Sequence, residues 1–201
     1  MINSNEKALD LIVAAIKKSG FKNGKEVSIC LDVAANELFK NNKYSIHSKK
    51  FISVKKSIKA YLKIINKYHI KSIEDPFAEN DWISWNKIMK SVKNVQIVGD
   101  DLYVTNLERL KKGFLTNSSN AILIKLNQIG TVSETLEVIK FAQKIGYKTI
   151  ISHRSGDNED TFIADLAVGT NSNQIKTGSL ARSERVSKYN QLIRIEEELG
   201  K

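Results

Sequence analysis

Ionisable side chains end each of six predicted strands in this 201-residue chain. Each strand is a short apolar or β-branched run, and a charged or imidazole side chain follows it directly. The residues at these six positions are Asp32, Glu74, Asp100, Lys125, His153 with Arg154, and Lys176. Turn chemistry explains one such residue, because turns favour Asp and Asn. Six in succession indicate a single functional site.

The three acids predict a metal site. Carboxylates of Asp32, Glu74 and Asp100 that converge on one point repel one another unless a cation lies between them. Oxygen-only ligands favour a hard cation, and Mg²⁺ commonly keeps open positions for substrate oxygens. The residue pattern alone does not distinguish Asp100 from Asp101. The alternative is three unrelated acids, each of which caps a turn or forms an ion pair.

The two lysines at strand ends predict a base. A lysine beside a divalent cation and a second cation is expected to have a lowered pKa, which a general base requires. For Lys125 or Lys176 alone, a surface or ion-pair role is the alternative. Taken with the acids, the set suits proton abstraction next to a carboxylate of a phosphorylated acid.

The stretch 149–156 predicts an anion subsite. A β-branched strand is followed by Arg154 and Ser155, and then a glycine opens the way to a helix expected over 161–168. Backbone N–H groups at a helix start, with arginine and hydroxyl donors beside them, bind anions such as phosphate. The alternative is an ordinary turn, in which the acidic residues of 157–160 favour the helix dipole.

Hydrophobic periodicity predicts alternating strands and helices. Strands are expected at 27–31, 70–73, 95–98, 121–124, 148–151 and 173–175, and helices at 5–19, 52–68, 80–92, 107–112, 131–145 and 182–199. Such alternation indicates parallel βαβ units. In a parallel α/β barrel the carboxyl ends of the strands share one rim, where their side chains converge. The last helix is expected to bury Val186, Tyr189, Ile193 and Leu199.

Composition narrows the class of protein. Hydrophobic residues make up 41% of the chain and proline occurs once, which favours a packed globular fold. No apolar run approaches the roughly 18 residues of a membrane span, and no secretory signal is visible. The single Cys30, in an apolar run, is expected to be buried, and these features predict a cytoplasmic location. The net charge of +10 comes from scattered lysines, which favours a solvated surface over a nucleic-acid partner.

Several strings resemble enolase (phosphopyruvate hydratase). They are Ser72-Ile73-Glu74-Asp75-Pro76-Phe77, residues 99–106, residues 124–131, Ser152-His153-Arg154-Ser155-Gly156, Gln174-Ile175-Lys176-Thr177-Gly178, residues 182–185 and residues 189–191. The resemblance covers nearly the whole chain, in order. It implies an α/β fold, a partial TIM-type (β/α) barrel with about six of eight βα units. Residues 1–201 are then a single, incomplete barrel domain.

The resemblance also implies roles for the strand-end residues. Asp32, Glu74 and Asp100 are expected to bind Mg²⁺, which selects Asp100 over its neighbour. Lys125 is expected to take the C2 proton of 2-phosphoglycerate. Lys176 is expected to hold the substrate carboxylate and to help stabilise the enolate.

The remaining pocket residues follow the same resemblance. Arg154 and Ser155 are expected to bind substrate near its phosphate, and His153 to line the same pocket. Loss of the 3-hydroxyl then gives phosphoenolpyruvate. These residues, with the metal ligands and the base, complete the predicted site of a Mg²⁺-dependent hydro-lyase of glycolysis and gluconeogenesis.

The resemblance also shows which features of enolases are absent from these 201 residues. Enolases carry an N-terminal α+β domain, two earlier barrel strands, and a Gly-Asp-Glu-Gly-Gly string whose Glu is credited as the general acid. No such string occurs in this sequence. We therefore expect impaired dehydration by the 201 residues alone, with a homodimer or a complementing N-terminal half as candidate partners. The alternative is a non-catalytic module that binds RNA or protein through its basic surface.

Overall fold

The computed structural model describes residues 2, 4–46 and 50–200. The chain divides into two compact units, which are described separately: unit 1 comprises residues 1–102 with 115–119, and unit 2 comprises residues 103–114 with 120–201. The two ends of the predicted single domain, Met1 and Lys201, lie outside the described residues. The assignment of 1–201 as a single domain stays a prediction.

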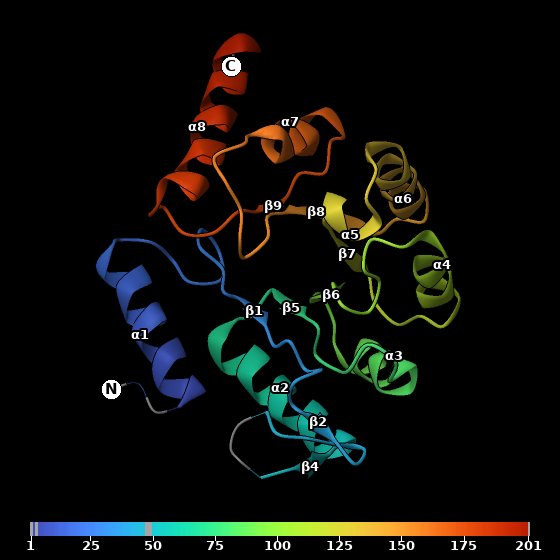
Figure 1. The fold of residues 1–201 in the computed structure, drawn as a ribbon. Coiled ribbons are helices and arrows are strands. Elements are labelled where there is room, and N and C mark those ends of the chain that lie inside the picture. Colours follow the sequence, from blue (N-terminus) through green and yellow to red (C-terminus); the bar gives the residue numbers. More distant parts are fainter. Residues whose placement is uncertain (1, 3, 47–49, 201) are drawn as a thin grey trace. The chain divides into compact units, whose positions relative to one another are not determined.

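Unit 1 alternates helices and strands (Figure 1). Its elements are α1 (Asn5–Lys18), β1 (Cys30–Asp32), β2 (Phe39–Lys40), β3 (Lys43–Tyr44), β4 (Ile52–Ser53), α2 (Val54–Tyr68), β5 (Ser72–Glu74), α3 (Trp82–Ser91) and β6 (Gln96–Gly99). Strands β1, β5 and β6 pair in parallel, whereas β2, β3 and β4 form an antiparallel sheet. The predicted parallel βαβ pattern is therefore confirmed for this unit.

Aromatic packing supports the segment that follows β5. The ring of Phe77 lies edge-on to Tyr44 and Tyr61, with ring centroids 5.0 and 5.9 Å apart. The buried Tyr61 hydroxyl donates to the carbonyl of Pro76 at 2.8 Å, and the Tyr44 hydroxyl accepts from the Ala78 amide at 3.1 Å. Because these residues are buried, the chain leaves β5 along a defined path.

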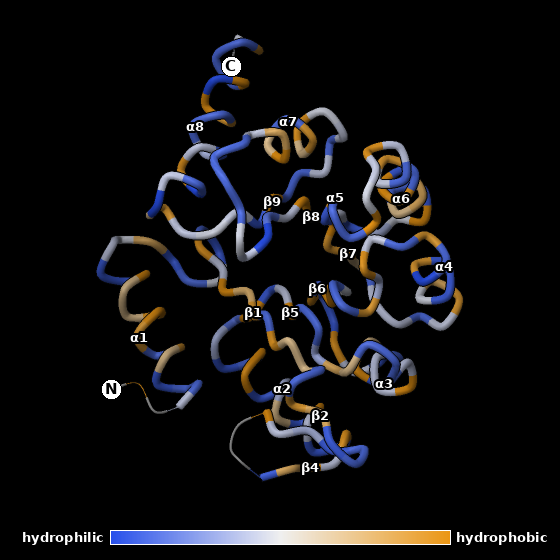
Figure 2. The backbone as a smooth tube through the Cα atoms, viewed as in Figure 1, coloured by the Kyte–Doolittle hydropathy of each residue, from blue (hydrophilic) through white to orange (hydrophobic). Residues whose placement is uncertain are grey.

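Unit 2 has the same alternation. Its elements are α4 (Leu107–Leu115), β7 (Ala121–Ile124), α5 (Leu126–Ile129), α6 (Val132–Lys144), β8 (Lys148–Ser152), α7 (Phe162–Gly169), β9 (Ile175–Lys176) and α8 (Ser183–Glu198). Strands β7, β8 and β9 pair in parallel, and all four residues of β7 are buried, as expected for a parallel sheet. Helix α6 carries hydrophobic and hydrophilic positions, as amphipathic helices do (Figure 2).

Two predicted features of unit 2 are wrong. Helix α4 was expected to end at Gly113 but continues to Leu115. The glycine is explained by packing instead: a Cβ there would be 2.1 Å from the oxygen of Tyr103. Helix α8 does not bury the predicted apolar side chains. Ile193 and Leu199 are more than half exposed, and the buried residues of this helix are Arg185 and Lys188.

Two further expectations concern unit 1 and membrane association. Cys30 was expected to be buried but is exposed, and β1 begins only there, three residues later than predicted. Strand β1 pairs with β5, and the apolar character of its sequence does not decide how much of it is covered.

Within the described residues, no helix combines the length and the apolar character needed to cross a membrane.

Candidate active site

The predicted acidic residues of unit 1 lie at the carboxyl ends of β1, β5 and β6. Asp32 and Glu74 are direct partners in the β1–β5 register, so they point to the same face. Glu74 in turn pairs with Val98, and Asp100 lies two residues beyond Val98, past the end of β6. Glu74 and Asp100 are buried, whereas Asp32 is exposed. Asp32 and Glu74 are therefore the last residues of β1 and β5, and Asp100 directly follows the last residue of β6.

Asp75 organises the backbone around these acids. It has a left-handed φ of 43°, and its carboxylate accepts the amide N–H groups of Asp100 and Asp101 at 3.0 and 2.9 Å. Among the described residues, carboxylate oxygens of Asp75, Asp100 and Asp101 lie within 4.8 Å of one another. This close group shares only Asp100 with the predicted metal ligands, so the predicted set is neither confirmed nor refuted.

The donor chemistry of this region fits Mg²⁺. Burial raises the pKa of Asp75 to about 8, and the negative charges of Asp101 and Asp100 also raise it against the effect of its two backbone hydrogen bonds. Crowded, buried oxygen donors of this kind are those that a hard divalent cation stabilises. Asp101 also accepts from the Asn36 side chain at 2.8 Å, a contact that distinguishes it from Asp100.

Asp75 was missed at the level of sequence. It appeared only within the string from Ser72 to Phe77, with no role of its own, and its left-handed backbone was not predicted. Its carboxylate holds the amide of Asp100, so its contribution is to place that residue. The spacing of 25 residues between the two carries no local signal, and only the parallel pairing of β5 with β6 brings them together.

The predicted basic residues belong to unit 2. Lys125 follows β7 directly and is half-buried. Its amide donates to the hydroxyl oxygen of Thr105 at 2.9 Å, and that hydroxyl donates to Gln128 at 2.8 Å. Thr105 is fully buried. A buried hydrogen-bonded chain therefore fixes the backbone from which the Lys125 side chain projects.

His153 lies among cationic side chains. Burial lowers its pKa, and the positive charges of Arg185, Lys176 and Lys125 lower it further, against an opposing effect of Asp157. Lys176 is the register partner of Ser152, and its carbonyl accepts the His153 amide at 3.0 Å. Lys176 and Lys125 therefore both oppose a positive charge on this imidazole, although less than burial and Arg185 do.

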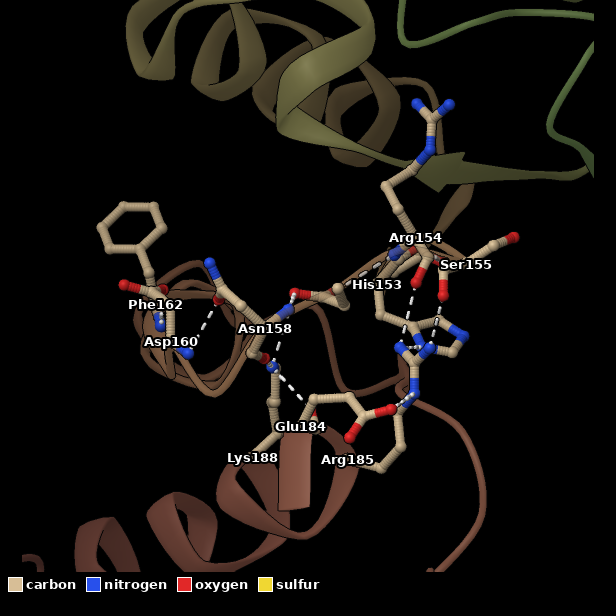
Figure 3. Close-up of polar contacts among 11 residues, drawn as sticks. His153, Arg154, Ser155, Asn158, Asp160, Phe162, Glu184, Arg185 and Lys188 are labelled. Carbon is tan, nitrogen blue, oxygen red and sulfur yellow. Dashed lines mark hydrogen bonds and ion pairs between the residues drawn. The ribbon is translucent and has the colours of Figure 1, made fainter. Parts of the chain in front are cut away.

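Arg154 and Ser155 are exposed at the start of the loop after β8. The Arg154 guanidinium donates to the side-chain oxygen of Asn127 at 3.0 Å, which extends it away from His153 (Figure 3). The Arg154 amide donates to the Asp157 carboxylate at 3.2 Å. Side-chain donors of both residues can therefore meet an anion from solvent.

The helix expected over 161–168 is present as α7, and its start lies well past Arg154 and Ser155 in the chain. Helix α7 begins at Phe162, and the Phe162 amide donates to the Asp160 carboxylate at 2.9 Å. Asn158 in turn accepts the Asp160 amide at 2.9 Å. The acidic segment therefore supplies an acceptor to the first amide of α7, as the alternative to an anion subsite predicted, and the role of Arg154 and Ser155 in anion binding stays a prediction.

Helix α8 contributes contacts that sequence reasoning assigned to no role. Arg185 donates to the carbonyls of Arg154 and Ser155, both at 2.9 Å, and to Nδ1 of His153. Lys188 donates to the carbonyl of Asn158 (Figure 3). The available signal was two basic residues three positions apart, which share one helix face.

Comparison with known proteins identifies the family. The family model described as "Enolase, C-terminal TIM barrel domain" matches residues 1–201. A curated protein named enolase, from Pelagibacter ubique (strain HTCC1062), is 86% identical over 201 residues, which is 100% of this chain and 48% of that protein. The chain therefore spans about half the length of this relative.

These matches bear out the resemblance seen in the strand-end strings and the predicted partial TIM-type fold. The parallel strands and intervening helices of each unit agree with that fold. The chain belongs to the enolase family and corresponds to its C-terminal TIM barrel domain.

Proposed function

We propose that these 201 residues supply the metal ligands, the base and the anion-binding residues of an enolase, which dehydrates 2-phosphoglycerate to phosphoenolpyruvate. The observation that carries the proposal is the 86% identity of the whole chain to a curated enolase, with Lys125 and Lys176 at the ends of two different parallel strands of unit 2. Two such lysines suit a substrate with phosphate and carboxylate groups.

Mg²⁺ is proposed as the cofactor, with Asp32, Glu74 and Asp100 as its ligands. The buried oxygen donors around Asp100 support this choice, and the close group with Asp75 and Asp101 supplies neighbouring acceptors. When bound, the ion would withdraw negative charge from the substrate carboxylate. Asp75 would act by holding the amides of Asp100 and Asp101 in place.

The cationic residues of unit 2 have distinct proposed tasks. Lys125, on a backbone fixed by Thr105, would take the C2 proton. Lys176 would pair with the substrate carboxylate and stabilise the charge that develops as the proton leaves. Arg154 and Ser155 would bind the phosphate region through their exposed donors.

Exchange of the C2 proton tests this proposal without the hydroxyl-elimination step. The chain would be incubated with 2-phosphoglycerate and Mg²⁺ in heavy water, and the C2 proton signal followed by NMR. We expect the signal to decay, and Lys125→Ala to abolish the decay. Lys140→Ala, which removes an exposed lysine of α6, is the matched control. Absence of exchange in a folded chain, or exchange that survives Lys125→Ala, would contradict the assignment of the base.

Turnover by the 201 residues is a separate matter. Their sequence contains no Gly-Asp-Glu-Gly-Gly string, so we propose that a coupled assay for phosphoenolpyruvate shows little or no dehydration. Robust turnover would show that another residue replaces the predicted acid. The cytoplasmic location, the homodimer and the complementing half stay predictions.

A binding role is the alternative function. Lysines 55, 59, 87 and 90 line a shallow hollow beside α2 and α3 of unit 1, a basic surface open to an acidic partner. Salt-dependent binding of RNA that survives Lys125→Ala and Asp100→Ala would favour this alternative. Loss of exchange activity in those variants, without any RNA binding by the parent chain, would exclude RNA as the partner of this basic surface.

A further inference from the structure

Helix α8 presents three polar side chains to the loops that follow β8 and β9. Arg185, Lys188 and Tyr189 are spaced so that they share one helix face. Arg185 and Lys188 are 8% and 0% exposed, which is unusual for basic residues. Buried cations are costly unless they are paired or hydrogen-bonded, so their partners indicate what they do.

Arg185 contacts three consecutive residues of the substrate loop, defined here as residues 153–158. It donates to the Arg154 and Ser155 carbonyls at 2.9 Å each, and its guanidinium also reaches Nδ1 of His153 (Figure 3). A guanidinium has donors and no acceptor. Nδ1 must therefore accept this hydrogen bond, and the single proton of the neutral ring lies on Nε2.

The surroundings of His153 favour the same neutral ring. Arg185 from α8, Lys176 from β9 and Lys125 after β7 all oppose a positive charge there, whereas Asp157 of the loop favours it. Burial opposes the positive charge more strongly than any of these groups, so the net effect is a lowered pKa of His153. Protonation of Nδ1 would also place two donors face to face.

Lys188 and Tyr189 hold the rest of the two loops. The Lys188 ammonium lies 3.5 Å from the Asp157 carboxylate and donates to the carbonyls of Asn158 and, at 2.7 Å, Glu184. The Tyr189 hydroxyl donates to the carbonyl of Gly178. One helix face therefore fixes both loops.

Close packing at Gly178 leaves the side chains of Arg185 and His153 little room to move. Gly178 has a φ of +89°, and a Cβ there would lie 2.8 Å from Cδ of Arg185 and 3.2 Å from Cε1 of His153. The backbone after β9 thus rests directly on the Arg185–His153 pair. A glycine is required there by both its conformation and its contacts.

We propose that Arg185 and Lys188 are positioning residues for the substrate loop, and that Arg185 holds His153 as the neutral Nε2–H tautomer, so that Nε2 presents a hydrogen-bond donor to an anionic group of the substrate. The substrate part of this inference rests on the proposed function. The tautomer and the loop anchoring belong to the free chain and can be measured without substrate.

Nuclear magnetic resonance of chain labelled with ¹⁵N at histidine tests the tautomer. The His153 signals are assigned by their loss in His153→Gln. We expect a protonated Nε2 and an unprotonated Nδ1, with a titration midpoint below 6.5. Arg185→Gln should mix the two tautomers and move the midpoint upward toward 6.5. Arg182→Gln, which removes an exposed arginine whose partner is Glu184, should leave both unchanged.

Loop anchoring is measured by amide hydrogen exchange on the same samples. In Arg185→Lys, which keeps the charge but loses the forked geometry, the amides of residues 154–158 should exchange at least about tenfold faster. If Arg185→Gln does not fold, this conservative variant and the parent spectrum carry the test.

A protonated Nδ1 in the parent chain would overturn the tautomer assignment. So would an unchanged His153 titration in folded Arg185→Gln, and unchanged exchange in Arg185→Lys would overturn the anchoring. Absence of C2 proton exchange together with the expected tautomer would instead contradict the proposed function and leave the positioning intact.

Discussion

Replacing the buried lysine of α8 offers a direct test of how unit 2 is held together. The Lys188 side chain is 1% exposed, and its partners are the Asp157 carboxylate and the carbonyls of Asn158 and Glu184. Lys188→Met keeps most of the side-chain volume but removes the ammonium. The change therefore leaves the packing largely intact and removes the polar contacts.

The contacts set the size of the effect. Asp157 is 20% exposed and retains two backbone N–H donors, so loss of the ion pair alone costs about 1 kcal/mol. Each of the two carbonyls left without its charged donor costs about 1 kcal/mol more. We expect the free energy of unfolding to fall by about 3 kcal/mol, or the melting temperature by about 6–12 °C for a chain of this size.

Urea unfolding followed by far-ultraviolet circular dichroism measures this loss. Both tryptophans, Trp82 and Trp85, belong to unit 1, so their fluorescence reports on the other unit. Lys140→Met on α6 removes an exposed lysine and should change stability by less than about 0.5 kcal/mol. If Lys188→Met unfolds at the same urea concentration as the parent chain, the inference that buried contacts of this lysine stabilise unit 2 is refuted.

Three further predictions concern unit 2. Gly113→Ala should destabilise the chain by about 1–2 kcal/mol in urea unfolding despite the better helix propensity of alanine, because the new Cβ would overlap Tyr103. Thr131→Ala should cost about 1 kcal/mol in the same assay, because the Thr131 hydroxyl caps α6 by accepting the Glu134 amide at 3.2 Å. Since the His153 pKa is lowered from 6.5, the unfolded state binds a proton first as the pH falls, so stability should decrease below about pH 6.5. His153→Gln should flatten that part of the pH dependence of the urea midpoint.

Matched variants and contrary outcomes accompany these predictions. Gly169→Ala changes a glycine of α7 where no described atom is within 4 Å of the new Cβ, so it should be neutral or stabilising. If Gly113→Ala changes the free energy of unfolding by the same amount as Gly169→Ala, overlap of the new Cβ with Tyr103 is excluded as the cause. Within the described chain the Thr161 side chain caps no amide of α7, so Thr161→Ala should cost less than Thr131→Ala. Equal pH slopes for His153→Gln and the parent would show that His153 is not the group responsible.

Local patterns in the sequence located most elements and strand ends. A β-branched run followed by an ionisable residue marks where a strand stops, and β5 and β9 end on Glu74 and Lys176 as predicted. The spacing of Thr131 and Glu134 likewise marks the start of α6. These signals succeed because strand propensity, helix caps and turns depend on neighbouring residues.

Burial was the part that local patterns predicted poorly. Apolar periodicity placed Ile193 and Leu199 of α8 inward, although both are exposed, and it placed Cys30 in a buried strand. The same reasoning ended α4 at Gly113, where the glycine instead makes room for Tyr103 within a helix that continues to Leu115. Which face of an element is covered depends on what packs against it, and the sequence of that element does not contain this information.

The sequence by itself determined which residues carry charge at the strand ends, and the resemblance of their strings to enolase identified the family. Only the tertiary structure decided how two of those ends are held. Parallel pairing brings the Asp75 carboxylate to the amide of Asp100, 25 residues away, and packing of α8 brings Arg185 to His153, 32 residues away. Both contacts join backbone or ring polar atoms to side chains far along the chain. Only the folded chain places such groups within hydrogen-bonding distance, where burial makes each contact necessary.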